Sequence, residues 1–484
     1  MTENIYRHTN GLKHINVIND EDFSALFVVN TPVFDNSGVA HAVEHMVFRR
    51  SDAFPKAETL FQITSLTDVK INASTFANTT YFHCQSHCYD TFLLAITYLI
   101  HGLFTPNFNN DDLRQEVHNG DKNGVIYREL LGSENIQNSN NEKKEKSEFS
   151  YGGLSESIGK LSLSDIKNFH QRYYQASNIT LITANADVDT VSDLLLLLPQ
   201  QNKHTKKEKT PLNNNKVNLQ YCENNEQHLK KYSPAIKKLI TIYQLWLQDP
   251  YYQEIDDFQT VENSSESESI PKVIEINNET YQSKINDHLI APLVNLSHLL
   301  TEQSKVNQPE NEGIKTPINL VIMPSLFTKL YQQATKQLVK NKKKCHSPFI
   351  SSHDQHNALW LTEVSGAEQA LASITSYILS AYPLFLARRC QGHCYATQAL
   401  TVEKSTYLVI YSAFDVNPVV QLQSITQNFI SLSQDPRFIQ QSLLMAKIKY
   451  SKTQQVNMKE LKHITANDVI AYLQALSTHP HPKV

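Results

Sequence analysis

The sequence predicts a mixed α/β (α+β) fold made of two related layered domains, in which helices pack on mostly antiparallel sheets. Apolar strand-like runs alternate with helical patterns in residues 1–200, as is typical of a layered domain. A similar mixture returns in residues 316–484. The polar residues 201–315 lie between these regions, so we expect two structured domains joined by a linker.

A repeated helix-start pattern suggests that the two domains are related. Ser162 lies three residues before Asp165, and Thr465 lies three residues before Asp468. In this arrangement the hydroxyl and the carboxylate each bond the backbone at the start of a helix. Apolar residues spaced three apart follow in both places, so we expect a capped amphipathic helix in each domain.

The composition excludes several classes of protein. The chain has 484 residues, a net charge of -4, 40% hydrophobic residues and 19% charged residues, which favours a globular protein without nucleic-acid or membrane partners. It has only 12 glycines and no glycine-rich phosphate-binding run. The polar N-terminus does not resemble a signal peptide, and no apolar stretch of about 18 residues predicts a membrane helix. Six scattered cysteines do not suggest a disulfide framework, so we expect a cytoplasmic location.

In the first domain, several apolar runs predict buried strands and further helices. The apolar residues 24–29 and 178–183 have the length and composition of buried strands. Residues 91–104 and 189–198 have the pattern of apolar helices. The polar, Asn-rich residues 134–146 are expected to form a surface loop.

The middle of the chain is predicted to be a polar linker with a helical hairpin. Residues 203–209 are basic and residues 254–268 are acidic and rich in serine, and such segments cannot bury enough apolar surface to order themselves. Residues 235–248 and 287–300 keep a helical pattern. These two helices are expected to form the hairpin.

The last domain is expected to mix strands and helices again. Its apolar runs predict strands at residues 318–322, 358–361 and 405–411. Its helical patterns cover residues 367–387, 419–432 and 467–476.

The chemistry is carried by a His-x-x-Glu-His motif. His41 and His45 lie four residues apart, so a helix places them on one face, about 6 Å apart, where both can bind one zinc ion. Glu44 lies close enough to receive a proton from an attacking water, while zinc acidifies that water and polarises a peptide carbonyl. The alternative is a chance match in a chain with 20 histidines. Two histidines and a glutamate buried together without a metal would be costly, which favours the zinc site.

A catalytic zinc requires a third protein ligand and one open position. Glu129 is the best candidate, but spacing alone does not select it because Glu116 is also available.

Several segments carry a more specific signal. Residues 38–45 have the form Gly-Val-x-His-x-x-Glu-His, and residues 124–132 contain Glu129 between flanking glycines. Together with residues 72–81, 151–154 and 169–178, they resemble the pitrilysin/insulinase family of zinc metallopeptidases, in particular a shortened form of its presequence-protease branch. The resemblance covers most of the first domain and places the third zinc ligand on Glu129.

The last domain resembles the non-catalytic partner domain of that family. Residues 389–395 are similar to its Arg-x-x-Gly-Gly-x-Tyr element, and residues 412–418 are similar to a second family element. The resemblance implies that the domains face each other across a cavity. It also implies that Arg389 and Tyr395 reach across it to bind peptide and stabilise the oxyanion.

By this resemblance, the chain is expected to be a zinc-dependent endopeptidase with one Zn2+ per chain. Its substrates would be short unstructured peptides inside an enclosed chamber. An added peptide strand would pair with Asn72, Ala73, Ser74 and Thr75. The reduced middle segment suggests a smaller chamber, or one completed by a homodimer or a second chain.

The sequence is also compatible with two alternatives. The first is a catalytically silent relative that acts as a binding or scaffold subunit of a peptidase complex. The retained Glu44, which is not a ligand, argues against it. The second is a different metal-dependent hydrolase with the same zinc site. The chain also departs from the family pattern at three positions, because Arg50 and His393 replace glycines and Lys122 replaces an acidic residue.

Overall fold

The computed structural model describes most of both patterned regions and little of the segment between them. It covers residues 2–8, 10–18, 22–121, 123–140, 150–196, 232–248, 274–275, 347–350, 357–402 and 406–478. The predicted strand at 318–322 and the predicted helix at 287–300 lie outside these residues. The boundaries of the linker therefore stay a prediction.

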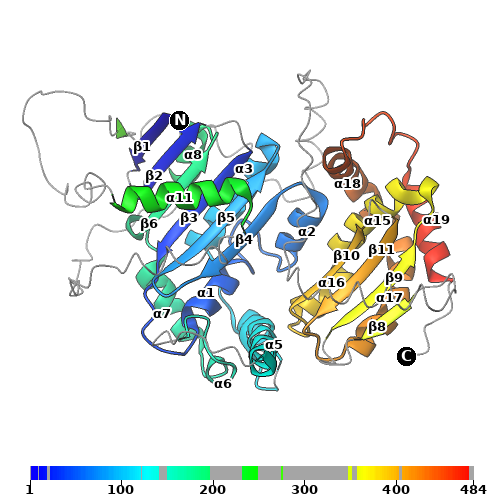
Figure 1. The fold of residues 1–484 in the computed structure, drawn as a ribbon, viewed down its shortest axis with the longest axis horizontal. Coiled ribbons are helices and arrows are strands. Elements are labelled where there is room, and N and C mark those ends of the chain that lie inside the picture. Colours follow the sequence, from blue (N-terminus) through cyan, green and yellow to red (C-terminus); the bar gives the residue numbers. More distant parts are fainter. Residues whose placement is uncertain are drawn as a thin grey trace, which may run out of the picture.

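The N-terminal unit, residues 2–196 together with 232–248 and 274–275, is built on a seven-stranded mixed sheet (Figure 1). The strand order is β4-β5-β3-β6-β2-β1-β7, and only the pairs β2–β6 and β1–β7 are parallel. The strands are β1 (Thr2–Arg7), β2 (Lys13–Ile18), β3 (Phe23–Asn30), β4 (Lys70–Thr75), β5 (Thr79–Ser86), β6 (Ile179–Ala184) and β7 (Ile274–Glu275). The expected strands at 24–29 and 178–183 correspond to β3 and β6.

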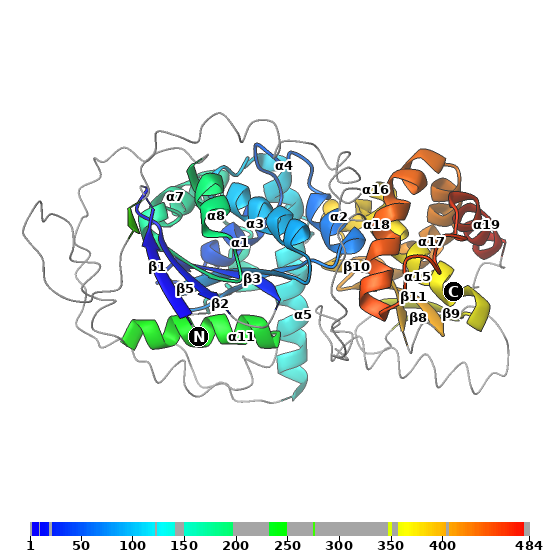
Figure 2. The ribbon, with the colours of Figure 1, turned by 90° about the horizontal axis from the view of Figure 1, so that it is seen from above.

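Helices cover both faces of this sheet (Figure 2). Along β3, Phe27 and Val29 point into the cluster under α1, α3, α7 and α8, whereas Leu26 and Val28 point towards α11, because successive strand side chains alternate between faces. The helices are α1 (Val39–Val47), α2 (Thr59–Leu66), α3 (Tyr89–Phe104), α4 (Asn110–Asp112), the π-helical turn η1 (Leu113–Val117), α5 (Val125–Asn140), α6 (Ser155–Ile158), α7 (Leu163–Tyr173), the short 3-10 turn η2 (Ala176–Asn178), α8 (Val188–Leu196) and α11 (Pro234–Gln248).

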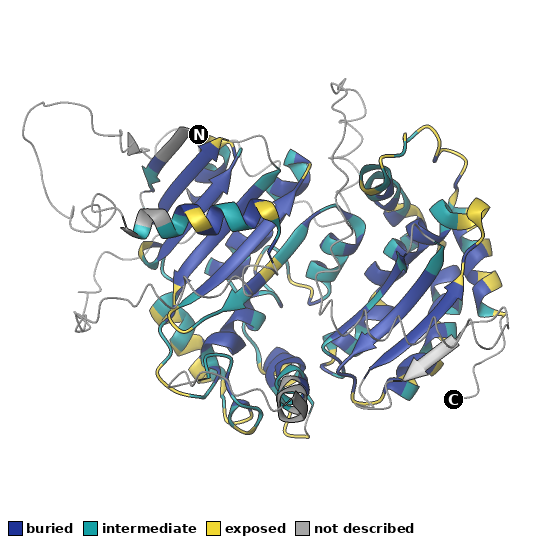
Figure 3. Ribbon diagram, in the orientation of Figure 1, coloured by how far each residue is buried: buried dark blue, intermediate teal, exposed yellow. Residues whose placement is uncertain are grey.

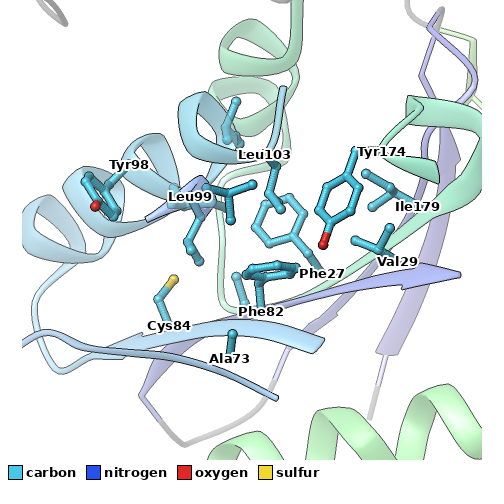
Figure 4. Close-up of a cluster of buried hydrophobic side chains, with 14 of the residues drawn as sticks. Phe27, Val29, Ala73, Phe82, Cys84, Tyr98, Leu99, Leu103, Tyr174 and Ile179 are labelled. Carbon is cyan, nitrogen blue, oxygen red and sulfur yellow. The ribbon is translucent and has the colours of Figure 1, made fainter. Parts of the chain in front are cut away.

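The main core lies between the sheet and the face covered by α1, α3, α7 and α8. Figure 3 shows the strands of this sheet as mostly buried. Figure 4 shows Phe27 and Phe82 from the sheet packed with Leu103 of α3 and with Tyr174 just after α7. Phe27, Phe82 and Leu103 are fully buried. This core supports the short helix α1 and so fixes the frame in which the His-x-x-Glu-His motif lies.

Two expectations for this half of the chain change. Helix α11 confirms the helical pattern of residues 235–248, but it packs on β3, β5 and β6 through Ile236, Leu239 and Ile240. Its apolar face is therefore part of the N-terminal unit. The surface loop expected at residues 134–146 was wrong for its first part, since α5 continues to Asn140.

The C-terminal unit, residues 347–350, 357–402 and 406–478, has a four-stranded antiparallel sheet of order β10-β11-β9-β8. Helices α15, α17, α18 and α19 share a buried cluster with one face of that sheet. The elements are β8 (Ser347–Ile350), β9 (Ala358–Glu363), the 3-10 turn η4 (Gly366–Glu368), α15 (Gln369–Ala381), α16 (Pro383–Cys390), β10 (Ala396–Val402), β11 (Tyr407–Ala413), α17 (Pro418–Ser433), α18 (Pro436–Gln454) and α19 (Ala466–Ser477). The fold class is therefore confirmed, with helices on mostly antiparallel sheets in both units.

Both predicted capping patterns are present, since Ser162–Asp165 and Thr465–Asp468 form reciprocal capping boxes at α7 and α19. The single helix expected at 367–387 was wrong. It is broken into α15 and α16, which meet at 50°. Pro383 lacks an amide hydrogen and forces the preceding residue into an extended conformation, so one helix ends before it and a new one starts.

Among the described helices, none is long and apolar enough by itself to cross a membrane. The bent pair Gly366–Ala381 and Pro383–Cys390 passes that test by length and composition only.

The two units contact each other directly, with α2 packed against α15 and α18 (Figure 1). Lys449 of α18 donates to the backbone oxygens of Thr64 and Ser65, at 2.7 and 3.0 Å. These oxygens belong to the last turn of α2, where a cation also suits the helix dipole. The enclosed cavity expected between the units stays a prediction.

Buried histidines predict that the fold loses stability in mild acid. His8 is 5% exposed beside His14, and burial lowers the pKa of His8 from 6.5 to about 4. Between about pH 4 and pH 6.5, His8 is therefore protonated in the unfolded chain but mostly neutral in the folded chain. Lowering the pH from 7 to 5 should cost about 2 kcal/mol of unfolding free energy from His8 alone. Urea unfolding at both pH values measures this cost.

The control for this prediction is the variant His8→Gln. Its unfolding free energy should change less between pH 7 and pH 5, by about 2 kcal/mol, than that of the wild type. An equal pH dependence in both proteins would contradict the assignment to His8.

Candidate metal centre

The motif helix α1 starts after Gly38, where both the backbone conformation and close packing favour glycine. Gly38 has φ 76°, a left-handed conformation that glycine adopts without strain. A Cβ atom on Gly38 would lie 3.0 Å from the Cα of Gly153, and one on Gly153 would lie 2.6 Å from the Cα of Gly38. The segment around Gly153 therefore lies directly against the first turn of α1, which brings the Gly152 carbonyl beside the motif.

The two histidines lie one helical turn apart, as the spacing predicts, with ring centroids 4.8 Å apart. Nδ1 of His41 lies 3.0 Å from the Gly152 oxygen, and Nδ1 of His45 lies 2.9 Å from Oε1 of Glu116. Because each partner oxygen accepts a hydrogen from Nδ1, the neutral tautomer leaves both Nε2 atoms as bare electron donors. The histidines are thus oriented as metal ligands.

Glu129 of α5 completes a three-residue cluster with these histidines. Its Oε2 lies 3.7 Å from Nε2 of His41 and 3.7 Å from Nε2 of His45. These separations are too long for hydrogen bonds, and Glu129 Oε2 is a buried atom without a hydrogen-bond partner among the described residues. All three ligand atoms lie within 4.8 Å of one another. An orphaned carboxylate oxygen facing two bare imidazole nitrogens fits zinc, which binds this donor set at about 2 Å.

Glu44 lies on the same helix but takes no part in this cluster. It is 7% exposed, and its Oε2 accepts a 2.5 Å hydrogen bond from the Thr75 hydroxyl at the end of β4. Sequence reasoning placed Thr75 in the substrate strand but did not predict this contact. No local signal reveals it, since the two residues are 31 positions apart.

The structure separates the two candidate third ligands. Glu129 faces the Nε2 side of His45, whereas Glu116 bonds its Nδ1 side from the turn η1. Burial alone would raise the pKa of Glu116, but Arg389 and the His45 hydrogen bond outweigh it and hold that pKa well below its usual range. Burial alone would lower the pKa of His45. The hydrogen bond and charge of Glu116 outweigh burial, so the pKa of His45 is raised. Glu116 is therefore an ionised partner that orients His45.

Arg389 and Tyr395 come near the cluster from the C-terminal unit. Nη1 and Nη2 of Arg389 donate to the two Glu116 oxygens at 2.9 and 2.8 Å, so its guanidinium binds a carboxylate of the site. Tyr395 is half-buried, and the Glu129 charge together with burial raises the pKa of its hydroxyl. The structure brings both residues to the site. Their expected contacts with peptide and oxyanion stay predictions.

The expected substrate strand is β4, the outermost strand on its side of the described sheet. Asn72 is exposed, Ala73 is buried, and Ser74 and Thr75 are half-buried. The strand ends beside Glu44, so the edge on which a peptide would pair leads to the candidate base. Peptide pairing there stays a prediction.

Arg50, which departs from the family pattern, has a structural partner. Its Nε donates to Oδ2 of Asp112 at 2.8 Å, and Oδ1 of the same carboxylate accepts from Arg49 at 2.9 and 3.0 Å. Lys122 lies outside the described residues.

Comparisons with known proteins match parts of this chain. No family model matches the chain. An uncharacterized protein of Schizosaccharomyces pombe is 27% identical over 169 residues, which are 32% of this chain and 16% of that protein. The mitochondrial presequence protease of Candida albicans is 28% identical over 205 residues, which are 37% of this chain and 19% of that protein. Part of this chain is similar to a presequence protease.

Among solved structures, pitrilysin aligns with 100% of this chain and 45% of its own, with a TM-score of 0.35 and 12% identity. The matched region spans less than a fifth of each of the two curated relatives. What the whole relatives do therefore enters only as a proposal.

Proposed function

We propose that this chain is a zinc-dependent endopeptidase of the pitrilysin/insulinase type, similar to its presequence-protease branch, that hydrolyses short unstructured peptides. One observation carries the proposal. A buried oxygen of Glu129, unpartnered among the described residues, faces the Nε2 atoms of His41 and His45, with Glu44 on the same helix. The partial similarity to a presequence protease supports peptide bonds as the target.

In this proposal His41, His45 and Glu129 hold one zinc ion. A zinc ion bound there would supply a Lewis acid able to polarise a peptide carbonyl and acidify water. Glu44 takes a proton from the attacking water and passes it to the leaving amine. The Thr75 hydroxyl holds the Glu44 carboxylate in place through its hydrogen bond. The edge of β4 aligns the peptide by backbone pairing, and Tyr395 donates to the developing oxyanion.

The proposed chamber encloses the peptide between the two units and excludes folded proteins by size. A homodimer or a second chain would complete it. A cytoplasmic location remains a prediction.

The second candidate is a catalytically silent subunit that binds peptides or a partner peptidase. One observation favours it. The Arg389 guanidinium expected to contact substrate is bound to both oxygens of Glu116. The intact set of Glu44 and three zinc ligands favours the peptidase.

The experiment combines metal analysis with peptide cleavage. The purified chain should hold one zinc per chain and cleave unstructured peptides from a library of graded length. A chelator should stop cleavage, and added zinc should restore it. A chain that binds zinc but cleaves no peptide would favour the catalytically silent subunit. A chain that binds no zinc would contradict both the site and the proposed activity.

The Thr75 contact predicts a smaller effect at the same site. Thr75→Val keeps the shape of the side chain but removes the hydroxyl that holds Glu44. Loss of one hydrogen bond to a carboxylate should lower kcat/KM by about 10-fold, with zinc content unchanged. The matched variant Thr75→Ser retains the hydroxyl and should keep most of the activity. Equal losses in both variants would show that the hydroxyl is not what matters.

A further inference from the structure

We propose that Arg389 is a positioning residue that orients the metal ligand His45 through Glu116. Docking of the C-terminal unit would then set the zinc affinity of a site whose ligands all lie in the N-terminal unit. This inference rests on the proposed zinc site. It assigns Arg389 a role that needs neither substrate nor oxyanion.

Glu116 lies between His45 and Arg389 and contacts both. Its Oε1 accepts from Nδ1 of His45 at 2.9 Å and from Nη2 of Arg389 at 2.8 Å. Its Oε2 accepts from Nη1 of Arg389 at 2.9 Å and lies 3.3 Å from Nη1 of Arg49. The Glu116 side chain is 2% exposed. One buried carboxylate therefore joins a metal ligand of one unit to a guanidinium of the other.

The paired guanidinium fixes the direction of the Glu116 carboxylate. A two-pronged arginine contact sets both the position and the plane of a carboxylate, which a single contact does not. Without Arg389, Glu116 would keep only the single His45 bond and the longer contact to Arg49, so its carboxylate could rotate away from His45. A ligand histidine that loses its hydrogen-bond partner typically loses metal affinity by about 10- to 100-fold.

The backbone on both sides holds this contact in place. The turn η1 presents Glu116. Gly392, just after α16, lies so close to this turn that a Cβ atom on it would be 2.0 Å from the Gln115 backbone oxygen. The amide of Gly124 donates to the Gly392 oxygen at 3.1 Å, and Nη2 of Arg49 donates to the Cys390 oxygen at 2.9 Å. Arg389 thus starts from a fixed backbone, and its side chain, which is 10% exposed, has little freedom. A contact held in this way can transmit the docking of one unit to the ligands of the other.

The test measures zinc affinity, independently of catalysis, by competition with a coloured chelator. The full-length proteins are the wild type, Arg389→Met, Glu116→Gln and the double variant. Arg388→Met is the matched control, because Arg388 is the preceding arginine of α16 but bonds Asp415 rather than Glu116. Urea unfolding of each protein shows that it is folded. The double variant removes both charges, so it leaves no uncompensated buried carboxylate if Arg389→Met unfolds.

Arg389→Met should weaken zinc binding by about 10- to 100-fold, whereas Arg388→Met should change it by less than about 3-fold. In the Glu116→Gln background, Arg389→Met should add little, because Arg389 acts through the carboxylate. Unchanged affinity in Arg389→Met would overturn the inference, as would a full additional loss in the double variant.

These outcomes separate the inference from the proposed function. Zinc binding that depends on Arg389, without peptide cleavage, would support the inference and contradict the peptidase. Peptide cleavage by a protein whose zinc affinity does not depend on Arg389 would support the peptidase and contradict the inference. A wild type that binds no zinc would overturn both.

Discussion

Replacing Glu44 with glutamine should lower peptide hydrolysis by about 10²- to 10⁴-fold, the usual contribution of a positioned general base. Zinc content should stay at the wild-type value. The reason is geometric, because Glu44 lies on the helix that carries both histidines but is not one of the three converging ligand groups. Glutamine keeps the shape and can still accept from the Thr75 hydroxyl. It cannot take a proton from water at neutral pH.

The measurement pairs zinc analysis with initial rates on one peptide. The control is Glu129→Gln, which removes a ligand and should lose zinc and activity together. A Glu44→Gln protein that keeps most of its activity would contradict the assignment of the base. Loss of zinc from this variant would instead place Glu44 among the ligands.

The motif helix was predictable because all of its information is local. A spacing of four residues fixes the side of a helix on which His41 and His45 lie, whatever the rest of the chain does. The strand before it and the glycine at its start are also local signals. The structure confirms the helix and adds the carbonyl of Gly152, which no spacing rule connects to His41.

The third ligand was not predictable from spacing. Glu116 and Glu129 are both far from the motif in sequence, and the side of the His45 ring that each faces depends on how η1 and α5 pack. The family resemblance favoured Glu129, and the structure places Glu129 on the Nε2 side of His45 and Glu116 on its Nδ1 side. The choice of ligand stays a prediction. The bond between Arg389 and Glu116 spans 273 positions, so it depends on tertiary structure alone.

The break between α15 and α16 is the opposite case, because a local signal, Pro383, opposes the apolar pattern. The apolar pattern of residues 367–387 continues through Pro383 because buried helices on both sides of a bend keep apolar faces. The position of Pro383, and not the apolar pattern, determines where one helix ends and the next begins. The break matters for the site, since it turns α16 so that Arg389 lies against η1.

Replacing Gly392 with alanine should be the most damaging small change at the contact between the units. Gly392 has φ 77°, and a Cβ atom there would lie 2.0 Å from the Gln115 backbone oxygen. The left-handed backbone costs an alanine about 1 kcal/mol, and relieving the clash requires either α16 or η1 to move. We expect the free energy of unfolding to fall by on the order of 3 kcal/mol. Urea unfolding measures it.

Gly120 offers a matched control, because it has φ 87° but a Cβ atom there would meet no described atom within 4 Å. Gly120→Ala should therefore show the backbone cost alone, about 1 kcal/mol. The difference between the two variants isolates the clash with Gln115. Equal losses of unfolding free energy in the two variants would mean that η1 can move to relieve the clash at little cost. Because Gln115 precedes Glu116 in the chain, a rigid contact predicts that Gly392→Ala also weakens zinc binding, whereas Gly120→Ala leaves it unchanged.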